Sequence, residues 1–108
     1  MKAIKNVEDF RQIVEQDKPI LLDFYADWCG PCKVMLPTVE KLAEEYKDDF
    51  VIAKVNVDQN QELAAHFQVR SIPALFFIQD KEVVEKLVGT QSRTTLENKI
   101  QQYTAVKK

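Results

Sequence analysis

The segment from Ile20 to Ala26 constrains the fold more than any other, because it is apolar on both faces apart from a single carboxylate. A strand with one face in water alternates apolar and polar residues, whereas a continuous apolar segment of this length is typical of a strand at the centre of a parallel sheet. The chain passes directly from this segment into one with helical periodicity, where Met35, Val39, Leu42 and Tyr46 form an apolar stripe. A buried strand followed at once by an amphipathic helix predicts an α/β fold.

The rest of the chain continues this alternation of strands and helices. We expect, in chain order, a short strand near Ala3, a helix capped by Asn6 and stopped by Lys18-Pro19, a strand over residues 51–57, a short helix from about Asn60, a hairpin of strands 74–78 and 83–88, and a last helix capped by Ser92. Pro37 falls inside the helix that follows the buried strand, where a proline is expected to cause a kink. These elements predict one domain over residues 1–108, with a central mixed sheet of four to five strands flanked by four helices.

The charge balance and the distribution of apolar residues exclude several classes of function. Fifteen Lys and Arg side chains against 17 Asp and Glu give a formal net charge of −2, with both signs interleaved, so no nucleic-acid partner is expected. No apolar segment approaches the roughly 18 residues that a membrane-spanning helix requires, so no membrane partner is expected either. Residues 1–10 mix charged and polar side chains and do not resemble a signal peptide. We therefore expect a cytoplasmic protein. We also expect it to act as a monomer.

The two cysteines, Cys29 and Cys32, are the first candidate functional residues. Two cysteines are too few for the disulfide framework of a small secreted domain, and in a reducing compartment such a pair binds a metal or takes part in redox or catalytic chemistry. A closed zinc site needs about four ligands, and the chain offers only His66 besides the cysteines, so no metal is expected. Two inert buried cysteines remain an alternative, but the position of the pair directly after a buried strand favours redox chemistry.

The position of the pair at the start of a helix predicts a role for each cysteine. Side chains at positions i and i+3 of the first turn lie on the same side of the helix, so a disulfide between them is feasible. Pro31 suits this turn, and the unpaired backbone N–H groups there favour a thiolate. We expect Cys29 to be exposed and to attack a substrate disulfide, and we expect the shielded Cys32 to resolve the mixed disulfide that forms. This exchange of electrons between sulfur atoms needs no organic cofactor.

The segment Asp23-Phe24-Tyr25-Ala26-Asp27-Trp28-Cys29-Gly30-Pro31-Cys32-Lys33 resembles the active-site signature of the thioredoxin family. The similarity extends over essentially the whole chain, because the order of elements and several distant residues fit as well. The resemblance implies the thioredoxin fold and the reduction of protein disulfides. It also implies two kinds of partner, namely disulfide-containing substrate proteins and a thioredoxin reductase, a flavoprotein that uses NADPH.

Asp23 and Lys54 are the expected catalytic partners of the cysteines. Asp23 interrupts an otherwise apolar strand, so we expect it to be buried, with a pKa raised by desolvation. The resemblance implies that this carboxylate accepts the proton from Cys32, and that Lys54 faces it across the sheet. A buried aspartate with only a structural role and a lysine that is merely exposed are the alternatives.

The resemblance also implies a substrate-binding surface beside the cysteines. Its residues are Trp28, Gly30, Pro31, Ile72, Pro73 and Gly89. Ile72-Pro73 matches the cis-proline loop of the family, whose backbone pairs with an extended substrate segment. Trp28 is expected to cover the disulfide, and Gly89 is expected to let a neighbouring loop approach without a side chain. An ordinary loop proline is the alternative interpretation of Pro73, and Ser71 and Ala74 depart from the usual family pattern next to it.

Two other functions remain open at this stage. An oxidase or isomerase shares the fold and the cysteine spacing, but such proteins commonly carry a histidine between the cysteines, where this chain has Gly30-Pro31. This dipeptide adds no positive charge beside the thiolate, which favours a reductant. The other function is a binding module in which the surface around Trp28, Ile72 and Gly89 docks a partner and the cysteines are incidental.

Overall fold

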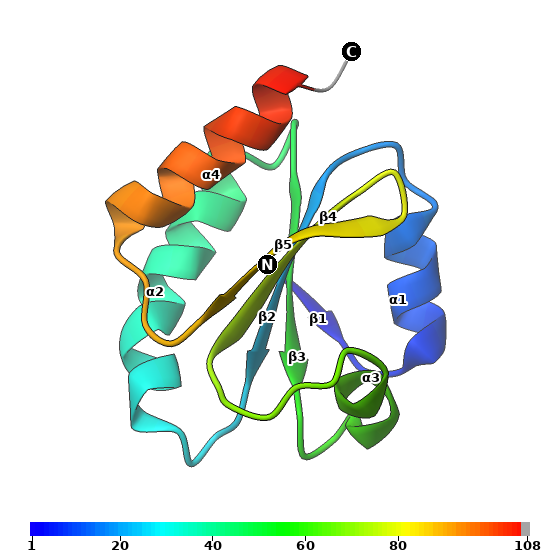
Figure 1. Ribbon diagram of the computed structural model, residues 1–108, viewed down its shortest axis with the longest axis vertical. Coiled ribbons are helices and arrows are strands. Elements are labelled where there is room, and N and C mark those ends of the chain that lie inside the picture. Colours follow the sequence, from blue (N-terminus) through cyan, green and yellow to red (C-terminus); the bar gives the residue numbers. More distant parts are fainter. Residues whose placement is uncertain (107–108) are drawn as a thin grey trace.

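A five-stranded sheet with the strand order β1-β3-β2-β4-β5 organises residues 1–106, the part of the chain that the computed structural model describes (Figure 1). The elements are β1 (Lys2–Ile4), α1 (Val7–Val14), β2 (Ile20–Tyr25), α2 (Gly30–Glu45), β3 (Val51–Asn56), α3 (Gln61–His66), β4 (Ala74–Gln79), β5 (Glu82–Val88) and α4 (Arg93–Val106). β1, β3 and β2 are parallel, whereas β4 runs antiparallel to β2, and β5 antiparallel to β4. This mixed sheet with its four helices confirms the predicted fold class.

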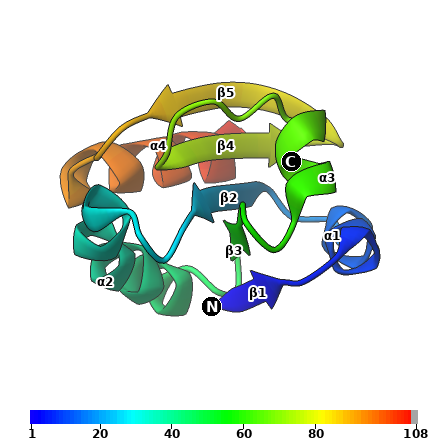
Figure 2. The same ribbon diagram turned by 90° about the horizontal axis from the view of Figure 1, so that it is seen from below.

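The sheet separates two hydrophobic clusters, each covered by a pair of helices. α1 and α3 cover one face, where Ile13 and Leu63 pack with Leu22 of β2. α2 and α4 cover the other, where Leu42 packs with Leu21 of β2 (Figures 1 and 2). Successive residues of β2 thus enter opposite clusters, which explains why this strand is apolar on both faces.

Two helix caps lie where the sequence predicts them, whereas one helix ends earlier than predicted. The Asn6 Oδ1 accepts a hydrogen bond from the Asp9 N–H at 2.8 Å, and the Ser92 Oγ accepts one from the Thr95 N–H at 3.1 Å. The expected stop of α1 at Lys18-Pro19 is wrong, because the helix ends at Val14. Residues 15–17 are exposed, so no apolar side chain holds a further turn against the sheet.

Three residues other than glycine have a positive φ at turns. Asp80 and Lys81, with φ of 54° and 69°, form the two-residue turn of the β4–β5 hairpin, so each strand is one residue longer than predicted. Gln68, with φ of 55°, follows α3, and the N–H groups of Gln68 and Val69 donate back to the carbonyls of Ala65 and Ala64 at 3.0 and 2.9 Å. Glycine is the residue that adopts this conformation without steric cost.

No helix within residues 1–106 is both long enough and apolar enough to pass through a bilayer. The longest, α2, has 16 residues and keeps Pro37 in its interior. Four residues separate its start at Gly30 from the end of β2 at Tyr25, and this junction positions the two cysteines.

Candidate active site

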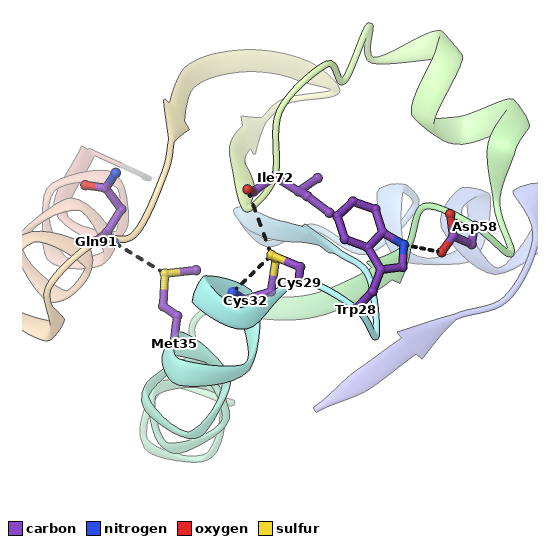
Figure 3. Close-up of a disulfide and its surroundings, with 7 residues drawn as sticks. All are labelled: Trp28, Cys29, Cys32, Met35, Asp58, Ile72 and Gln91. Carbon is purple, nitrogen blue, oxygen red and sulfur yellow. Dashed lines mark hydrogen bonds between the residues drawn. A yellow bond between two sulfur atoms is a disulfide. The ribbon is translucent and has the colours of Figure 1, made fainter.

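Cys29 and Cys32 form a disulfide at the junction of β2 and α2, with their Cα atoms 5.3 Å apart (Figure 3). Cys29 is the N-cap residue of α2, and its Sγ accepts a hydrogen bond from the backbone N–H of Cys32 at 3.2 Å. Pro31 occupies the first turn, where no intrahelical partner exists for a backbone N–H. One sulfur therefore lies at the positive end of the helix dipole and accepts a hydrogen bond there.

The expected difference in exposure between the two cysteines is wrong. Cys29 is 5 % exposed and Cys32 is 4 % exposed, because both pack with Ala26 and with the partly buried Tyr25 and Ile72. The two sulfurs differ instead in hydrogen bonding, since the Cys29 Sγ is the one that caps the helix. The backbone N–H of Cys32, which donates to this sulfur, stabilises a thiolate at Cys29 relative to a thiol.

Asp23 is buried on β2, as expected, with 1 % of its surface exposed. It lies on the same face of the sheet as Leu21, beneath α2 and α4, and closer to the end of the strand that leads to Cys29. Its Oδ1 has no hydrogen-bond partner. Desolvation by burial raises the pKa of this carboxyl from 3.8 to about 7, although the charge of Lys54 acts in the opposite direction. Asp23 can therefore hold or release a proton near neutral pH.

Lys54 lies beside Asp23, because the two residues are register partners on β3 and β2. Ile52, two residues earlier on β3, belongs to the cluster under α2 and α4, so Lys54 is on the same face of the sheet as Asp23. Its Nζ lies 5.8 Å from the centroid of the Tyr25 ring, within the range of a cation–π contact. The structure thus brings together the aspartate and the lysine that the sequence predicts as partners.

The Ile72–Pro73 peptide bond is cis, as predicted, and the loop around it lies against the disulfide. The Ile72 carbonyl oxygen is 3.9 Å from the Cys29 Sγ (Figure 3). On the other side, the Pro73 carbonyl accepts a hydrogen bond from the Gly89 N–H at 2.8 Å. The loop therefore connects the disulfide with the segment that follows β5.

The reason expected for Gly89 is wrong. A Cβ atom at this position would meet nothing within 4 Å, so no close approach of another segment requires a glycine. Gly89 has a φ of +93°, a conformation that side chains other than glycine rarely adopt. The backbone conformation, and not the space around it, explains the residue. Gly30 likewise has open space around it.

Trp28 lies at the surface, with 69 % of the residue exposed. Its Nε1 donates a hydrogen bond to the Asp58 Oδ2 at 2.8 Å, and the indole points toward Asp58 (Figure 3). The backbone N–H of Asp58 in turn donates to the side chain of the buried Asn56 at 2.9 Å. Sequence reasoning missed Asp58 and Asn56, because no local pattern indicates a contact between residues 30 positions apart.

The thioredoxin family profile matches residues 2–102. The chain belongs to the thioredoxin family. It is 48 % identical over 99 residues to the thioredoxin of Haemophilus influenzae, covering 91 % of this chain and 92 % of that protein. Its fold is similar to that of a mutant thioredoxin from Halobacterium salinarum, with a TM-score of 0.89 and 40 % identity over 95 % of this chain and 89 % of that one.

A further relative combines two activities in its name. The bifunctional thioredoxin reductase/thioredoxin of Mycobacterium leprae is 40 % identical over 87 residues, which are 81 % of this chain and 19 % of that protein. Membership of the thioredoxin family, together with the Cys29–Cys32 disulfide, makes this chain a protein-disulfide oxidoreductase that acts through a dithiol pair. Within residues 1–106, no three His, Cys, Asp or Glu side chains are grouped to hold a metal ion.

Proposed function

We propose that this thioredoxin-family chain reduces disulfides in other proteins, with Cys29 as the nucleophile and Cys32 as the resolving cysteine. The observation that carries this assignment is the hydrogen bond from the Cys32 N–H to the Cys29 Sγ at the start of α2. A helix N-terminus and a donated hydrogen bond both favour ionisation of Cys29. The uncharged Gly30-Pro31 supports reduction, because a positive charge there would stabilise the thiolate further and make the pair more oxidising.

The reaction consists of two thiol–disulfide exchanges. The Cys29 thiolate attacks one sulfur of the substrate disulfide, forms a mixed disulfide and releases the other substrate sulfur as a thiolate. The Cys32 thiol then gives its proton to Asp23, and the Cys32 sulfur attacks the Cys29 Sγ and releases the second substrate thiolate. Two electrons have passed to the substrate, and the chain holds the Cys29–Cys32 disulfide.

The role of Asp23 as proton acceptor rests on its burial and on its position beneath α2. A carboxyl whose pKa is about 7 is a much stronger base than an exposed aspartate, and it is still ionised in part of the molecules at neutral pH. Lys54, its register partner, favours the ionised form. Without this lysine, Asp23 would hold its proton to a higher pH and accept the proton of Cys32 less often.

The substrate binds beside the disulfide in an extended form. The backbone of Ile72 pairs with it, because the Ile72 carbonyl is a backbone group that lies next to the Cys29 Sγ. The cis Pro73 follows Ile72 in the same loop. Gly89, whose N–H is hydrogen-bonded to the Pro73 carbonyl, lies beside this loop and borders the substrate-binding surface. Trp28 adds an exposed aromatic surface, Gly30 leaves open space at the first turn of α2, and Pro31 is exposed beside it.

A thioredoxin reductase, a flavoprotein that uses NADPH, restores the dithiol. The name of the Mycobacterium leprae relative, which joins a reductase and a thioredoxin in one protein, supports such a partner.

The chain acts as a monomer in the cytoplasm, with residues 1–108 forming one domain.

Trapping of the mixed disulfide tests the roles of the two cysteines. The Cys32→Ser variant should accumulate a covalent adduct with a protein disulfide substrate such as insulin, linked through Cys29. The Cys29→Ser variant should form no adduct and should not reduce the substrate. Mass spectrometry of the adducts decides the matter, and a stable adduct through Cys32 in the Cys29→Ser variant would reverse the assignment.

A further inference from the structure

The segment between β5 and α4, residues 89–92, is hydrogen-bonded to the cis-proline loop and to α2, which both lie beside the disulfide. At one end, the Gly89 N–H donates to the Pro73 carbonyl at 2.8 Å. At the other, the Gln91 backbone N–H donates to the Sδ of Met35 at 3.4 Å (Figure 3). Met35 lies on α2 one turn after Cys32 and is 2 % exposed, so the acceptor sulfur is inside the protein.

The side chain of Gln91 folds back onto the same segment. Its Nε2 donates to the Gly89 carbonyl at 3.1 Å and to the Val88 carbonyl at 3.4 Å. An amide nitrogen carries two hydrogens, so one side chain can serve both carbonyls. The backbone of Gln91 is thus hydrogen-bonded to α2, while its side chain binds the backbone of Val88 and Gly89.

Two other contacts hold the start of this segment, because Val88 is the register partner of Ala74 and the Gly89 N–H donates to the Pro73 carbonyl. The side chain of Gln91 adds a contact on the carbonyl side of both residues. Gly89 has a φ of +93° and no side chain, so its backbone can reach many other conformations. Val88 is an exposed apolar residue at the end of the edge strand β5. A displacement of the segment would move Val88 and Gly89 relative to Ile72, against which we place the substrate.

We infer that Gln91 is a positioning residue for extended protein substrates. Its bonds to the Val88 and Gly89 carbonyls and to Met35 hold this stretch of backbone in place at the edge of the proposed substrate-binding surface. This inference rests on the proposed function. A protein substrate that lies along this surface depends on the position of Val88 and Gly89, whereas a small disulfide that reaches only the sulfur of Cys29 does not.

The test compares two substrates in steady-state assays. The Gln91→Leu and Gln91→Glu variants keep the size of the side chain but lose both donors. Each should raise the KM for insulin about five- to tenfold, as expected for the loss of one or two hydrogen bonds, and should change kcat less than about twofold. The rate with 5,5′-dithiobis(2-nitrobenzoic acid), a small aromatic disulfide, should stay within about twofold of the wild type. The matched control is Gln101→Leu, since Gln101 is an exposed glutamine of α4 bonded to the Tyr46 hydroxyl.

A second measurement keeps the inference falsifiable if one variant folds poorly. Amide hydrogen exchange of Gly89 in the disulfide form should be roughly tenfold faster in Gln91→Glu than in the wild type and in Gln101→Leu. An unchanged KM for insulin, an equal loss with both substrates, or unchanged exchange at Gly89 would overturn the inference. Failure of the wild type to reduce insulin would overturn the proposed function itself, which distinguishes the two results.

Discussion

Replacement of Asp23 by asparagine should stabilise the disulfide form of the chain at pH 8 but not at pH 4. The carboxyl is 1 % exposed and its Oδ1 lacks a hydrogen-bond partner, so ionisation in the folded protein costs more than ionisation in the unfolded chain. Asparagine has nearly the same shape and carries no charge at any pH. The difference in stability between the two proteins therefore measures the cost of that charge.

The magnitude follows from the raised pKa. Because the pKa of Asp23 rises from 3.8 to about 7 on folding, the unfolded chain loses this proton at a lower pH than the folded protein does. The wild type thus loses stability relative to Asp23→Asn as the pH rises from about 4 to about 7, and the difference is constant above that range. At about 1.4 kcal/mol for each pKa unit, the full change is about 4 kcal/mol.

Unfolding by guanidinium chloride, followed by circular dichroism between pH 4 and pH 8, gives the free energies. The buried asparagine amide adds a cost in free energy that is the same at every pH. The decisive quantity is therefore how much the difference in unfolding free energy between Asp23→Asn and the wild type changes from pH 4 to pH 8. Asp27→Asn, which removes an exposed carboxylate near the same site, should shift the unfolding free energy by less than about 0.5 kcal/mol. A difference between Asp23→Asn and the wild type that stays constant from pH 4 to pH 8 would refute the reasoning.

Three further predictions concern turnover, a turn and the exposed indole. Asp23→Asn should reduce insulin about a hundredfold more slowly than the wild type at pH 7, with part of the rate returning as hydroxide replaces the lost base at higher pH, in stopped-flow assays of the resolving step. Lys81→Gly should raise the unfolding free energy by about 0.5 to 1 kcal/mol in denaturant titrations, because φ at this position is +69°. Asp58→Ala should free the Trp28 indole and increase its mobility in time-resolved fluorescence anisotropy.

Each of these has a result that would contradict it. Wild-type rates in Asp23→Asn at pH 7, with resolution limiting, would remove the aspartate from the mechanism. Lys86→Gly, a substitution in the adjacent strand β5, should destabilise the protein, so a gain there equal to that of Lys81→Gly would argue against the backbone explanation. Unchanged anisotropy in Asp58→Ala would mean that other contacts fix the indole.

Much of the fold could be predicted because its signals are local in the sequence. The apolar segment that became β2, the caps at Asn6 and Ser92 and the cysteines at the start of α2 each involve neighbouring residues, and each was confirmed. The burial of Asp23 could be predicted for the same reason. Both faces of its strand are apolar and therefore buried, so its side chain is buried on whichever face it lies.

Contacts between distant segments could not be predicted in this way. The bond from Gln91 to Met35 joins residues 56 positions apart, and it forms only because the segment after β5 passes beside α2. The burial of Cys29 has a similar cause, since Ile72 reaches it from a loop 43 positions away. A sequence indicates which residues can cap, pair or ionise, whereas the packed chain decides which of them meet.

The separation of the two hydrophobic clusters by the sheet has a consequence for protein engineering. Side chains on opposite faces share no direct contact, so the effects of paired substitutions such as Ile13→Val and Leu42→Ala on unfolding free energy should be additive within about 0.5 kcal/mol. The layer under α1 and α3 does not contain the disulfide, whereas α2 carries both the second cluster and Cys32. Val57 and Ile72 pack against both the first cluster and the cysteine pair, so stability can be tuned independently of the redox centre at positions of the first layer away from these two residues. Those positions are the place to look for neutral variation and for thermostable variants.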